Sequence, residues 1–283
     1  MSNFWTRVIT GALFVAVMMG CIWWSYWSSA VLFLVISVLG LWEFYLLLEK
    51  NNYKPQKYFG ITGGISIFIF ISYESNHPLF LGWSVALLLI FFLLFFVFFI
   101  TELFRKTEKP FQNIGFTILG LIYIPIPFLV WLPNVFKHGE EMNLLNSYVI
   151  YNPDILLGFF FLVWSNDTFA YLVGRAFGKH KLFERISPKK TWEGFIGGIL
   201  CTQIIAYLIS IYFTELAPMH WHIVALIVSI FGTLGDLVES MFKRSLGVKD
   251  SGNILPGHGG ILDRFDGVLL SSPFVVTYLM LVR

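Results

Sequence analysis

Long apolar runs separated by short polar segments form the main pattern of the chain. The clearest run is residues 79–100, because these 22 residues include no charged side chain. An α-helix of about 20 apolar residues crosses the roughly 30 Å hydrocarbon core of a bilayer. The pattern therefore predicts a series of membrane-spanning helices.

An uncharged run also lies near the start of the chain, at residues 8–42. A single helix of this length would measure about 52 Å, well beyond the hydrocarbon core. We therefore divide the run at the polar turn 25–29 into two spans. Glu43 follows the second span directly. It either pairs within the helix bundle or marks the membrane interface, and we favour the interface.

The remaining apolar runs predict seven more spans. They fall within residues 58–73, 79–100, 114–131, 155–177, 194–214, 221–242 and 263–282. Pro125 and Pro127 predict a kink in the fifth span, because proline lacks the backbone N–H that a helix interior uses. The predicted fold class is all-α: a polytopic integral membrane protein with about nine transmembrane helices.

Positive charges are distributed unevenly among the polar segments. If the N-terminus lies in the cytoplasm, 17 of the 19 Lys and Arg residues fall in cytoplasmic segments, and only Lys137 and Arg283 lie outside. Cytoplasmic loops of membrane proteins carry such an excess. The sequence therefore predicts a cytoplasmic N-terminus and a C-terminus outside. Spans one to five belong to residues 1–150, and spans six to nine to residues 151–283, with the functional site on the cytoplasmic side.

The composition agrees with a membrane protein. Hydrophobic residues make up 57% of the chain and charged residues 13%, against about 25% charged residues in soluble domains. Cys21 and Cys201 lie in apolar runs and form neither a disulfide framework nor a metal knuckle. The net charge of +2 says little by itself, and we expect no nucleic acid among the partners.

Residues 240–267 differ from the rest of the chain because they are rich in charge, His and Gly. A solvated loop between two helices explains the lysines, but not Asp263 and Asp266 at the edge of an apolar helix. Arg and Lys bind phosphate, carboxylates bind Mg²⁺, and glycine lets the backbone approach a ligand closely. Together these residue types indicate phosphoryl-transfer chemistry.

This stretch resembles the signature of the phosphatidate cytidylyltransferase (CDP-diacylglycerol synthase) family. The signature reads S-x-x-K-R, four residues, K-D-x-G, a short spacer and P-x-H-G-G-x-x-D-R-x-D. Its fixed positions are all filled, by Ser240, Lys243, Arg244, Lys249, Asp250, Gly252, Pro256, His258, Gly259, Gly260, Asp263, Arg264 and Asp266. The resemblance implies the reaction CTP + phosphatidate → CDP-diacylglycerol + pyrophosphate, a step of phospholipid biosynthesis. CTP, phosphatidate and membrane lipid are then the expected partners, and a bacterial cell membrane is the expected location.

The resemblance and the residue chemistry together suggest roles for the residues of this stretch. Asp236 and Asp263 are expected to hold Mg²⁺, and a second monovalent or divalent cation nearby is allowed for. Asp250 and Asp266 would support the metal or orient the cationic side chains.

The cationic residues of the stretch are expected to bind phosphate. These are Lys243, Arg244 and Arg264, and Arg264 is assigned to the lipid head group. His258 either donates to a phosphate oxygen or serves only in a turn.

Two segments outside the signature are candidates for binding the nucleotide. Ser187-Pro188 predicts a helix start, with Ser187 as the N-cap. Lys189 and Lys190 would then lie in the first turn, where helix N–H groups suit the phosphates of CTP; the alternative is contact with anionic lipid. Asn166-Asp167 lies inside the sixth span, where a carboxylate costs roughly 2.5–3.5 kcal/mol. This pair either joins helices or lines a polar site.

Two other classes of protein fit less well. A CDP-alcohol phosphotransferase needs Asp-Gly-x-x-Ala-Arg, whereas Asp266-Gly267 is followed by Val-Leu-Leu-Ser. A transporter would explain carboxylates within spans, but it predicts polar residues near the bilayer midplane, and here polarity is gathered on one side. The oligomeric state is left open, a homodimer included.

Overall fold

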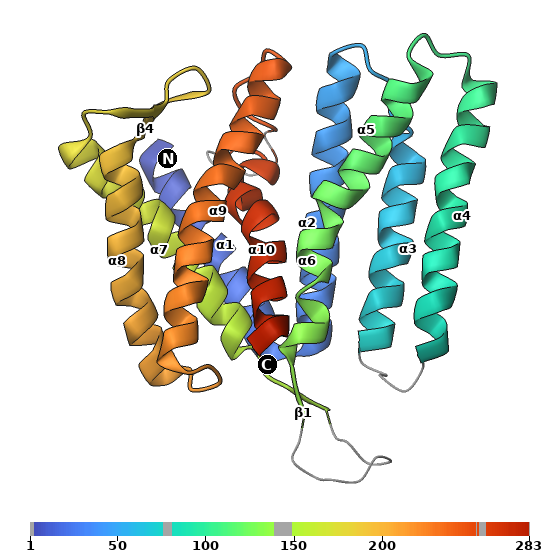
Figure 1. Cartoon of the computed structure of the whole chain (residues 1–283). Coiled ribbons are helices and arrows are strands. Elements are labelled where there is room, and N and C mark those ends of the chain that lie inside the picture. Colours follow the sequence, from blue (N-terminus) through green and yellow to red (C-terminus); the bar gives the residue numbers. More distant parts are fainter. Residues whose placement is uncertain (1–2, 76–80, 139–148, 253, 255–258, 283) are drawn as a thin grey trace.

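The computed structural model describes residues 3–75, 81–138, 149–252, 254 and 259–282. Its helices are α1 (Asn3–Trp24), α2 (Tyr26–Lys50), α3 (Lys57–Ser75), α4 (Leu81–Arg105), α5 (Pro110–Tyr123), α6 (Pro125–Leu129), α7 (Asp154–Phe177), α8 (Trp192–Tyr212), α9 (Pro218–Ser245) and α10 (Leu262–Val282), with a 3₁₀ turn η1 (Leu132–Val135). Two short antiparallel ribbons pair β1 (Phe136–His138) with β2 (Val149–Tyr151) and β3 (Lys181–Phe183) with β4 (Ser187–Thr191). The long helices run roughly side by side (Figure 1).

Six helical segments of the described chain are long and apolar enough to cross a membrane. They are Tyr26–Lys50, Pro110–Val135, Asp154–Phe177, Trp192–Tyr212, Pro218–Ser245 and Leu262–Val282. Shorter apolar helices cover Val8–Trp24 and Lys57–Tyr73, and each sequence-predicted span contains helix. The chain is therefore an all-α polytopic membrane protein, as predicted. The number of nine crossings and the orientation remain predictions.

Local sequence signals set two helix boundaries. Ser25 separates α1 from α2 and caps α2 reciprocally with Ser28. The Oγ of Ser25 accepts from the Ser28 N–H (3.1 Å), and the Oγ of Ser28 accepts from the Ser25 N–H (3.0 Å). The predicted division of the first apolar run is thus confirmed. α5 ends at Tyr123 and α6 begins at Pro125, which agrees with the predicted kink because proline cannot donate the next helical hydrogen bond.

The four C-terminal helices are the most closely packed part of the bundle. α9 contacts both α8 and α10, and α7 packs on α8. α10 also contacts α6 and α2, so the N-terminal helices support it. One buried apolar cluster contains residues of both groups; in it Phe33 of α2 lies 5.3 Å from Phe128 and 6.2 Å from Phe160, measured between ring centroids. The division of the chain into residues 1–150 and 151–283 stays a prediction.

Glycine residues allow α9 and α10 to approach closely. A Cβ atom on Gly267 would lie 3.5 Å from the carbonyl oxygen of Gly232, and one on Gly235 would collide with the carbonyl group of Asp266. Small residues at such crossings let membrane helices pack backbone against backbone. The carboxylate of Asp236, next to Gly235, is consequently within electrostatic range of Asp266 on the facing helix.

The polar connections gather at two ends of the bundle. The α2–α3 turn, the α4–α5 turn, the β3–β4 hairpin and the C-terminal end of α9 lie at one end, whereas the β1–β2 ribbon and the C-terminal end of α10 lie at the other (Figure 1). The first group contains most of the lysines and arginines that were predicted to be cytoplasmic. The arrangement agrees with that grouping of charge, while the side of the membrane that each end faces stays a prediction.

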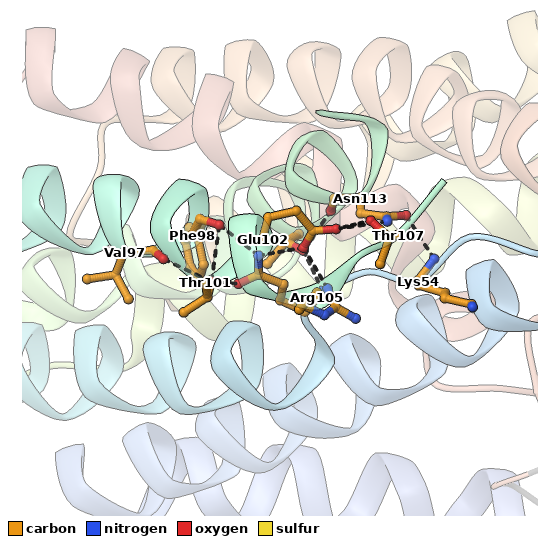
Figure 2. A network of polar contacts seen from close by, with 10 residues as sticks. Lys54, Val97, Phe98, Thr101, Glu102, Arg105, Thr107 and Asn113 are labelled. Atoms are coloured by element: carbon orange, nitrogen blue, oxygen red, sulfur yellow. Dashed lines mark hydrogen bonds and ion pairs between the residues drawn. The ribbon is translucent and has the colours of Figure 1, made fainter. Parts of the chain in front are cut away.

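A buried carboxylate joins the turns at the first of these ends. Glu102 of α4 is 4% exposed and accepts four hydrogen bonds (Figure 2). The donors are Thr107 Oγ1 (2.5 Å) and Asn113 Nδ2 (3.1 Å) at Oε1, and Gln56 Nε2 (2.8 Å) and Arg105 Nη1 (2.8 Å) at Oε2. The network therefore ties the α2–α3 turn to α4 and to the start of α5.

The predicted helix start at Ser187-Pro188 is wrong. Residues Ser187–Thr191 are strand β4, in a register that pairs Lys181 with Thr191 and Phe183 with Ser187. The helix begins after Thr191, whose Oγ1 accepts from the Gly194 N–H (3.2 Å). Glu193 in the first turn of α8 accepts from the backbone N–H of His180 (3.2 Å). This contact folds the preceding segment back as a hairpin, so Thr191 becomes the cap in place of Ser187.

Candidate active site

A cavity of about 650 Å³ lies among α7, α8, α9, α10 and the β3–β4 hairpin. We call it the first cavity. Seven residues that the sequence singled out line it: Asn166, Asp167, Lys189, Lys190, Asp236, Asp263 and Asp266. They come from α7, β4, α9 and α10, which are far apart in the sequence, so only the folded bundle brings them together.

Basic side chains line the part of the first cavity that is formed by the hairpin and the end of α7. They are Arg175, Lys181, Lys189 and Lys190, and we call this set the basic rim. Three of them, Arg175, Lys181 and Lys189, are exposed to solvent. Sequence reasoning counted Arg175 and Lys181 only as loop charges. The high density of positive charge between residues 175 and 190 was the signal that could have included them.

An ion pair joins the basic rim to α9. Lys190 Nζ lies 2.5 Å from Asp236 Oδ2 and donates to the carbonyl oxygen of Thr233 (3.4 Å). The other oxygen of Asp236 accepts from Ser240 Oγ (3.3 Å) one turn further along the helix. The hairpin is thus held over the carboxylate that the sequence assigned to a metal ion.

Asp263 holds the signature stretch together at the start of α10. Its Oδ1 accepts from Lys243 Nζ (2.6 Å). Its Oδ2 accepts from the N–H and Oγ of Ser251, both at 3.0 Å, and from the N–H of Gly260 (2.8 Å). Lys243 also forms an ion pair with the buried Glu239. Lys243 therefore pairs with two carboxylates, one of which, Glu239, the sequence reasoning did not assign to the site.

Negative charge is concentrated around Asp266. Its Oδ1 accepts from the Gly267 N–H (2.8 Å), and the carboxylates of Asp236 and Asp167 lie within electrostatic range. Like charges in a partly desolvated site repel each other. A cation that entered the first cavity would therefore be stabilised there.

The carboxylates of the first cavity could hold Mg²⁺ together with a ligand that supplies further oxygen atoms. In the described part of the chain, no group of three or more His, Cys, Asp or Glu side chains is arranged as a ready metal site. Mg²⁺, however, is usually held by one or two carboxylates together with water and substrate phosphates. Asp236, Asp263 and Asp266 line one cavity and offer the required oxygen atoms. The residues therefore fit a Mg²⁺ ion that binds together with a phosphate-bearing ligand.

A second cavity, of about 300 Å³, lies between α1, α7 and α10. It shares Asp167, Asp263 and Asp266 with the first cavity. Its remaining lining residues are Thr10, Gly11, Phe14, Val15, Trp164, Thr168 and Arg264. Arg264 thus lies beside apolar side chains of α1 and is not among the residues that line the first cavity.

Other predicted site residues lie outside both cavities. Among the described lining residues, Ser187, Lys243, Arg244 and Asp250 are absent. Arg244 Nη1 donates to the carbonyl oxygen of Val248 (3.2 Å) and so closes the end of α9. His258 lies outside the described residues.

Glu43 pairs within the bundle, which is the alternative that the sequence analysis did not favour. Its side chain is buried, with 3% of the residue exposed, and it accepts hydrogen bonds from Ser251 Oγ and the Leu262 N–H. A carboxylate that is followed by five more apolar residues, 44–48, is better placed to pair within the bundle. The apolar residues 44–48 were thus the signal in the sequence that Glu43 pairs within the bundle.

Fold and site together define a class: a polytopic helical membrane protein with a cavity whose cations and carboxylates suit a phosphate-bearing ligand and a metal ion. The family model described as "Cytidylyltransferase family" matches residues 5–282. The chain therefore belongs to the cytidylyltransferase family.

Named relatives agree with this family. A Staphylococcus aureus protein named phosphatidate cytidylyltransferase is 44% identical over 172 residues, which cover 60% of this chain and 60% of that protein. Proteins of the same name from Staphylococcus haemolyticus and Staphylococcus saprophyticus are 43% and 42% identical, with the same coverage. The match thus spans 60% of the length of these relatives.

Proposed function

We propose that the protein catalyses the reaction CTP + phosphatidate → CDP-diacylglycerol + pyrophosphate. The observation that carries this proposal is the convergence of Asp236, Asp263 and Asp266 with Lys189 and Lys190 around one cavity. The names of the staphylococcal relatives support the same substrates.

The two cavities suit the two substrates. CTP carries several negative charges and would enter at the basic rim, where Lys189 and Lys190 can hold its phosphates. Phosphatidate would place its head group in the second cavity, where Arg264 can bind a phosphate bidentately and Phe14 and Val15 offer an apolar wall. The shared carboxylates lie where the two phosphates would meet.

The proposed step forms one bond and breaks one. A phosphate oxygen of phosphatidate attacks the α-phosphorus of CTP. The bond between that phosphorus and the oxygen bridging to the β-phosphate breaks, and pyrophosphate leaves with the electron pair. The attacking phosphate is already ionised, so the protein supplies no nucleophile. Its side chains position the two substrates in line and neutralise their charge.

Mg²⁺ is the proposed cofactor, held by Asp236 and Asp263 with Asp266 in the same cavity, and a second cation nearby is compatible with this set. A bound Mg²⁺ would supply positive charge that stabilises the cytidylyl group during its transfer. Lys190 and Lys243 pair with Asp236 and Asp263 in the structure and are proposed to turn toward phosphate oxygens when the substrates bind.

Three other assignments rest on the signature alone. They are a phosphate contact for Arg244, support of the site by Asp250 and a phosphate contact for His258. We further propose that the site faces the cytoplasm from a bacterial cell membrane, because CTP is found there and the basic segments share one end of the bundle.

The test is an assay of the purified protein in mixed micelles of detergent and phosphatidate with Mg²⁺ and each of the four nucleoside triphosphates, labelled at the α-phosphorus. Label is expected in the lipid fraction with CTP, with one pyrophosphate released per lipid product. Omission of phosphatidate is the control. The proposal would be contradicted if no label entered the lipid fraction with CTP, or if all four nucleotides labelled it equally.

A further inference from the structure

Glu43 of α2 is a buried carboxylate behind the signature stretch. Its Oε2 lies 3.2 Å from Ser251 Oγ, whose one proton is shared with Asp263, and accepts from the backbone N–H of Leu262 (3.1 Å). Its Oε1 is buried without a hydrogen-bond partner in the described structure. An unsatisfied charged oxygen inside an apolar bundle is costly. Glu43 therefore costs stability at this position, and the reason for its presence is sought in its other contacts.

Two glycines of the signature leave room for this carboxylate. A Cβ atom on Gly252 would collide with Glu43 Oε1, and one on Gly260 would collide with both carboxylate oxygens and with Ser251 Oγ. Neither glycine is among the described residues with positive φ. Their lack of a side chain is therefore explained by the close approach of Glu43, a residue 208 positions before Ser251.

Ser251 links Glu43 to Asp263. Its Oγ lies 3.2 Å from Glu43 Oε2 and 3.0 Å from Asp263 Oδ2, and its backbone N–H donates to the same Oδ2. Glu43 also accepts from Leu262, the first residue of α10 and the neighbour of Asp263. Negative charge at the N-terminus of a helix is favourable. Glu43 thus contacts both the hydroxyl of Ser251, which lies against the Asp263 carboxylate, and the backbone N–H directly before Asp263.

We propose that Glu43 is a positioning residue that holds Ser251 and the start of α10, so that the carboxylate of Asp263 faces the first cavity. The proposal rests on the proposed function, because the placement of Asp263 matters for turnover only if this cavity carries out cytidylyl transfer. Glu43 lines neither cavity and therefore acts through Ser251 and Leu262 alone.

The first test compares Glu43→Leu, which keeps the size of the side chain but removes both acceptors, with Glu43→Gln, which keeps one. A misplaced catalytic group can cost about 10²-fold in rate, so we expect Glu43→Leu to lower kcat by about that factor, with the KM for CTP within about twofold of wild type. Glu43→Gln should recover part of the loss. Glu49→Gln on the same helix is the matched control, because Glu49 pairs with Lys57 and should leave kcat unchanged.

A second readout does not depend on activity. Hydrogen–deuterium exchange of peptides that cover residues 259–263 should be faster in Glu43→Leu than in wild type, while peptides from α8 stay unchanged. If the wild-type protein makes no lipid-linked cytidylyl product, the proposed function is wrong, and these exchange rates decide separately whether Glu43 orders the start of α10. Unchanged exchange at 259–263 would overturn the proposal.

Gly252→Ala keeps the proposal testable where Glu43→Leu folds poorly. Its added methyl group would push against the Glu43 carboxylate and lower kcat in the wild-type background. In a Glu43→Ala background the methyl group has space, so adding Gly252→Ala should change kcat less than about twofold, because contacting residues are coupled. If the losses of the two single variants instead multiply in the double variant, Glu43 does not act through this contact and the proposal is overturned.

Discussion

Glu102 and Asp266 are carboxylates of the same helical bundle with opposite surroundings. Glu102 receives four hydrogen bonds, two at each oxygen, from one side chain of its own helix and from three side chains of neighbouring segments (Figure 2). Asp266 lies instead near Asp236 and Asp167, so its neighbours include two further negative charges. The first cavity lies beside this group, whereas Glu102 lines none of the described cavities.

The difference distinguishes a carboxylate that supports the fold from one that serves a ligand. Where the chain supplies every partner, a buried charge joins the segments around it and leaves nothing for another molecule to satisfy. Where carboxylates are crowded beside a cavity, as around Asp266, lysines already pair with two of them, Asp236 and Asp263. Further positive charge that arrives with a ligand would still be stabilised there, because the remaining like charges repel each other. Substitutions at the cavity should therefore change kcat or KM, whereas substitutions around Glu102 should change the stability of the fold.

The largest effect is expected from removing one carboxylate of the cavity. Asp236→Asn and Asp263→Asn should each lower kcat at least about 10²-fold, since each takes away charge that would hold a metal ion against the substrate phosphates. The measurement is the rate of lipid-linked cytidylyl formation from phosphatidate and CTP.

Thermal unfolding in detergent is the control for these two variants. Asp236 is half-exposed, so Asp236→Asn should unfold at nearly the wild-type temperature. A value of kcat within about twofold of wild type would contradict its assignment. The shared ion would be contradicted by a Mg²⁺-bound structure with the Asp236 and Asp263 carboxylates more than about 8 Å apart, because Mg–O distances are about 2.0–2.1 Å.

The cations of the two cavities should separate kinetically, with effects of roughly tenfold. Lys189→Ala combined with Lys190→Ala should mainly raise the KM for CTP, because contacts to the ground-state phosphates are lost. Arg264→Lys keeps the charge but loses the bidentate fork, so it should lower kcat or raise the KM for phosphatidate. Steady-state kinetics in mixed micelles, with each substrate varied in turn, measure both. A change confined to the KM for CTP in Arg264→Lys would show that the lipid phosphate is placed wrongly.

Glu102→Gln should change stability and leave catalysis intact. The substitution removes the charge and puts an N–H group where one oxygen now accepts two hydrogen bonds, at a cost of about 1–3 kcal/mol. Unfolding in detergent should therefore occur at lower temperature, while kcat per folded molecule stays within about twofold of wild type. If kcat falls as far as in Asp236→Asn, the two regions do not differ in the way proposed.

The smallest expected effect concerns accessibility. The α4–α5 turn and the C-terminal end of α9 lie at the same end of the bundle (Figure 1), so single cysteines placed there should behave alike. In a variant without Cys21 and Cys201, Glu108→Cys and Ser245→Cys should both resist an impermeant thiol reagent added to intact cells, yet react after the membrane is opened. Ready labelling of either position from outside would contradict the predicted orientation.

The sequence was most informative for features that depend only on residues close together in the chain. Ser25 and Pro125 mark helix boundaries because a cap and a missing N–H act within one helical turn. The signature residues Asp263 and Asp266 could likewise be found, because the resemblance to the family rests on residues that lie close together in the sequence. The same holds for the basic segment that contains Lys189 and Lys190, although its conformation was predicted wrongly.

The remaining features depend on contacts between distant segments. Thr191 replaces Ser187 as the helix cap because Glu193 draws His180 back onto α8, and no local pattern shows this pairing. Glu43 meets the signature only when α2 packs beside α10. The second cavity needs the side chains of α1 next to Arg264, so it too appears only in the folded bundle.

The glycine contact between α9 and α10 has a consequence for how this site can change in evolution. A methyl group at position 235 would alter no charge and remove no proposed ligand, but it would collide with the carbonyl group of Asp266 and force the two helices apart. The distance between α9 and α10 therefore determines how densely negative charge is packed between them. A residue with no chemistry of its own therefore controls how close the carboxylates of the two helices lie.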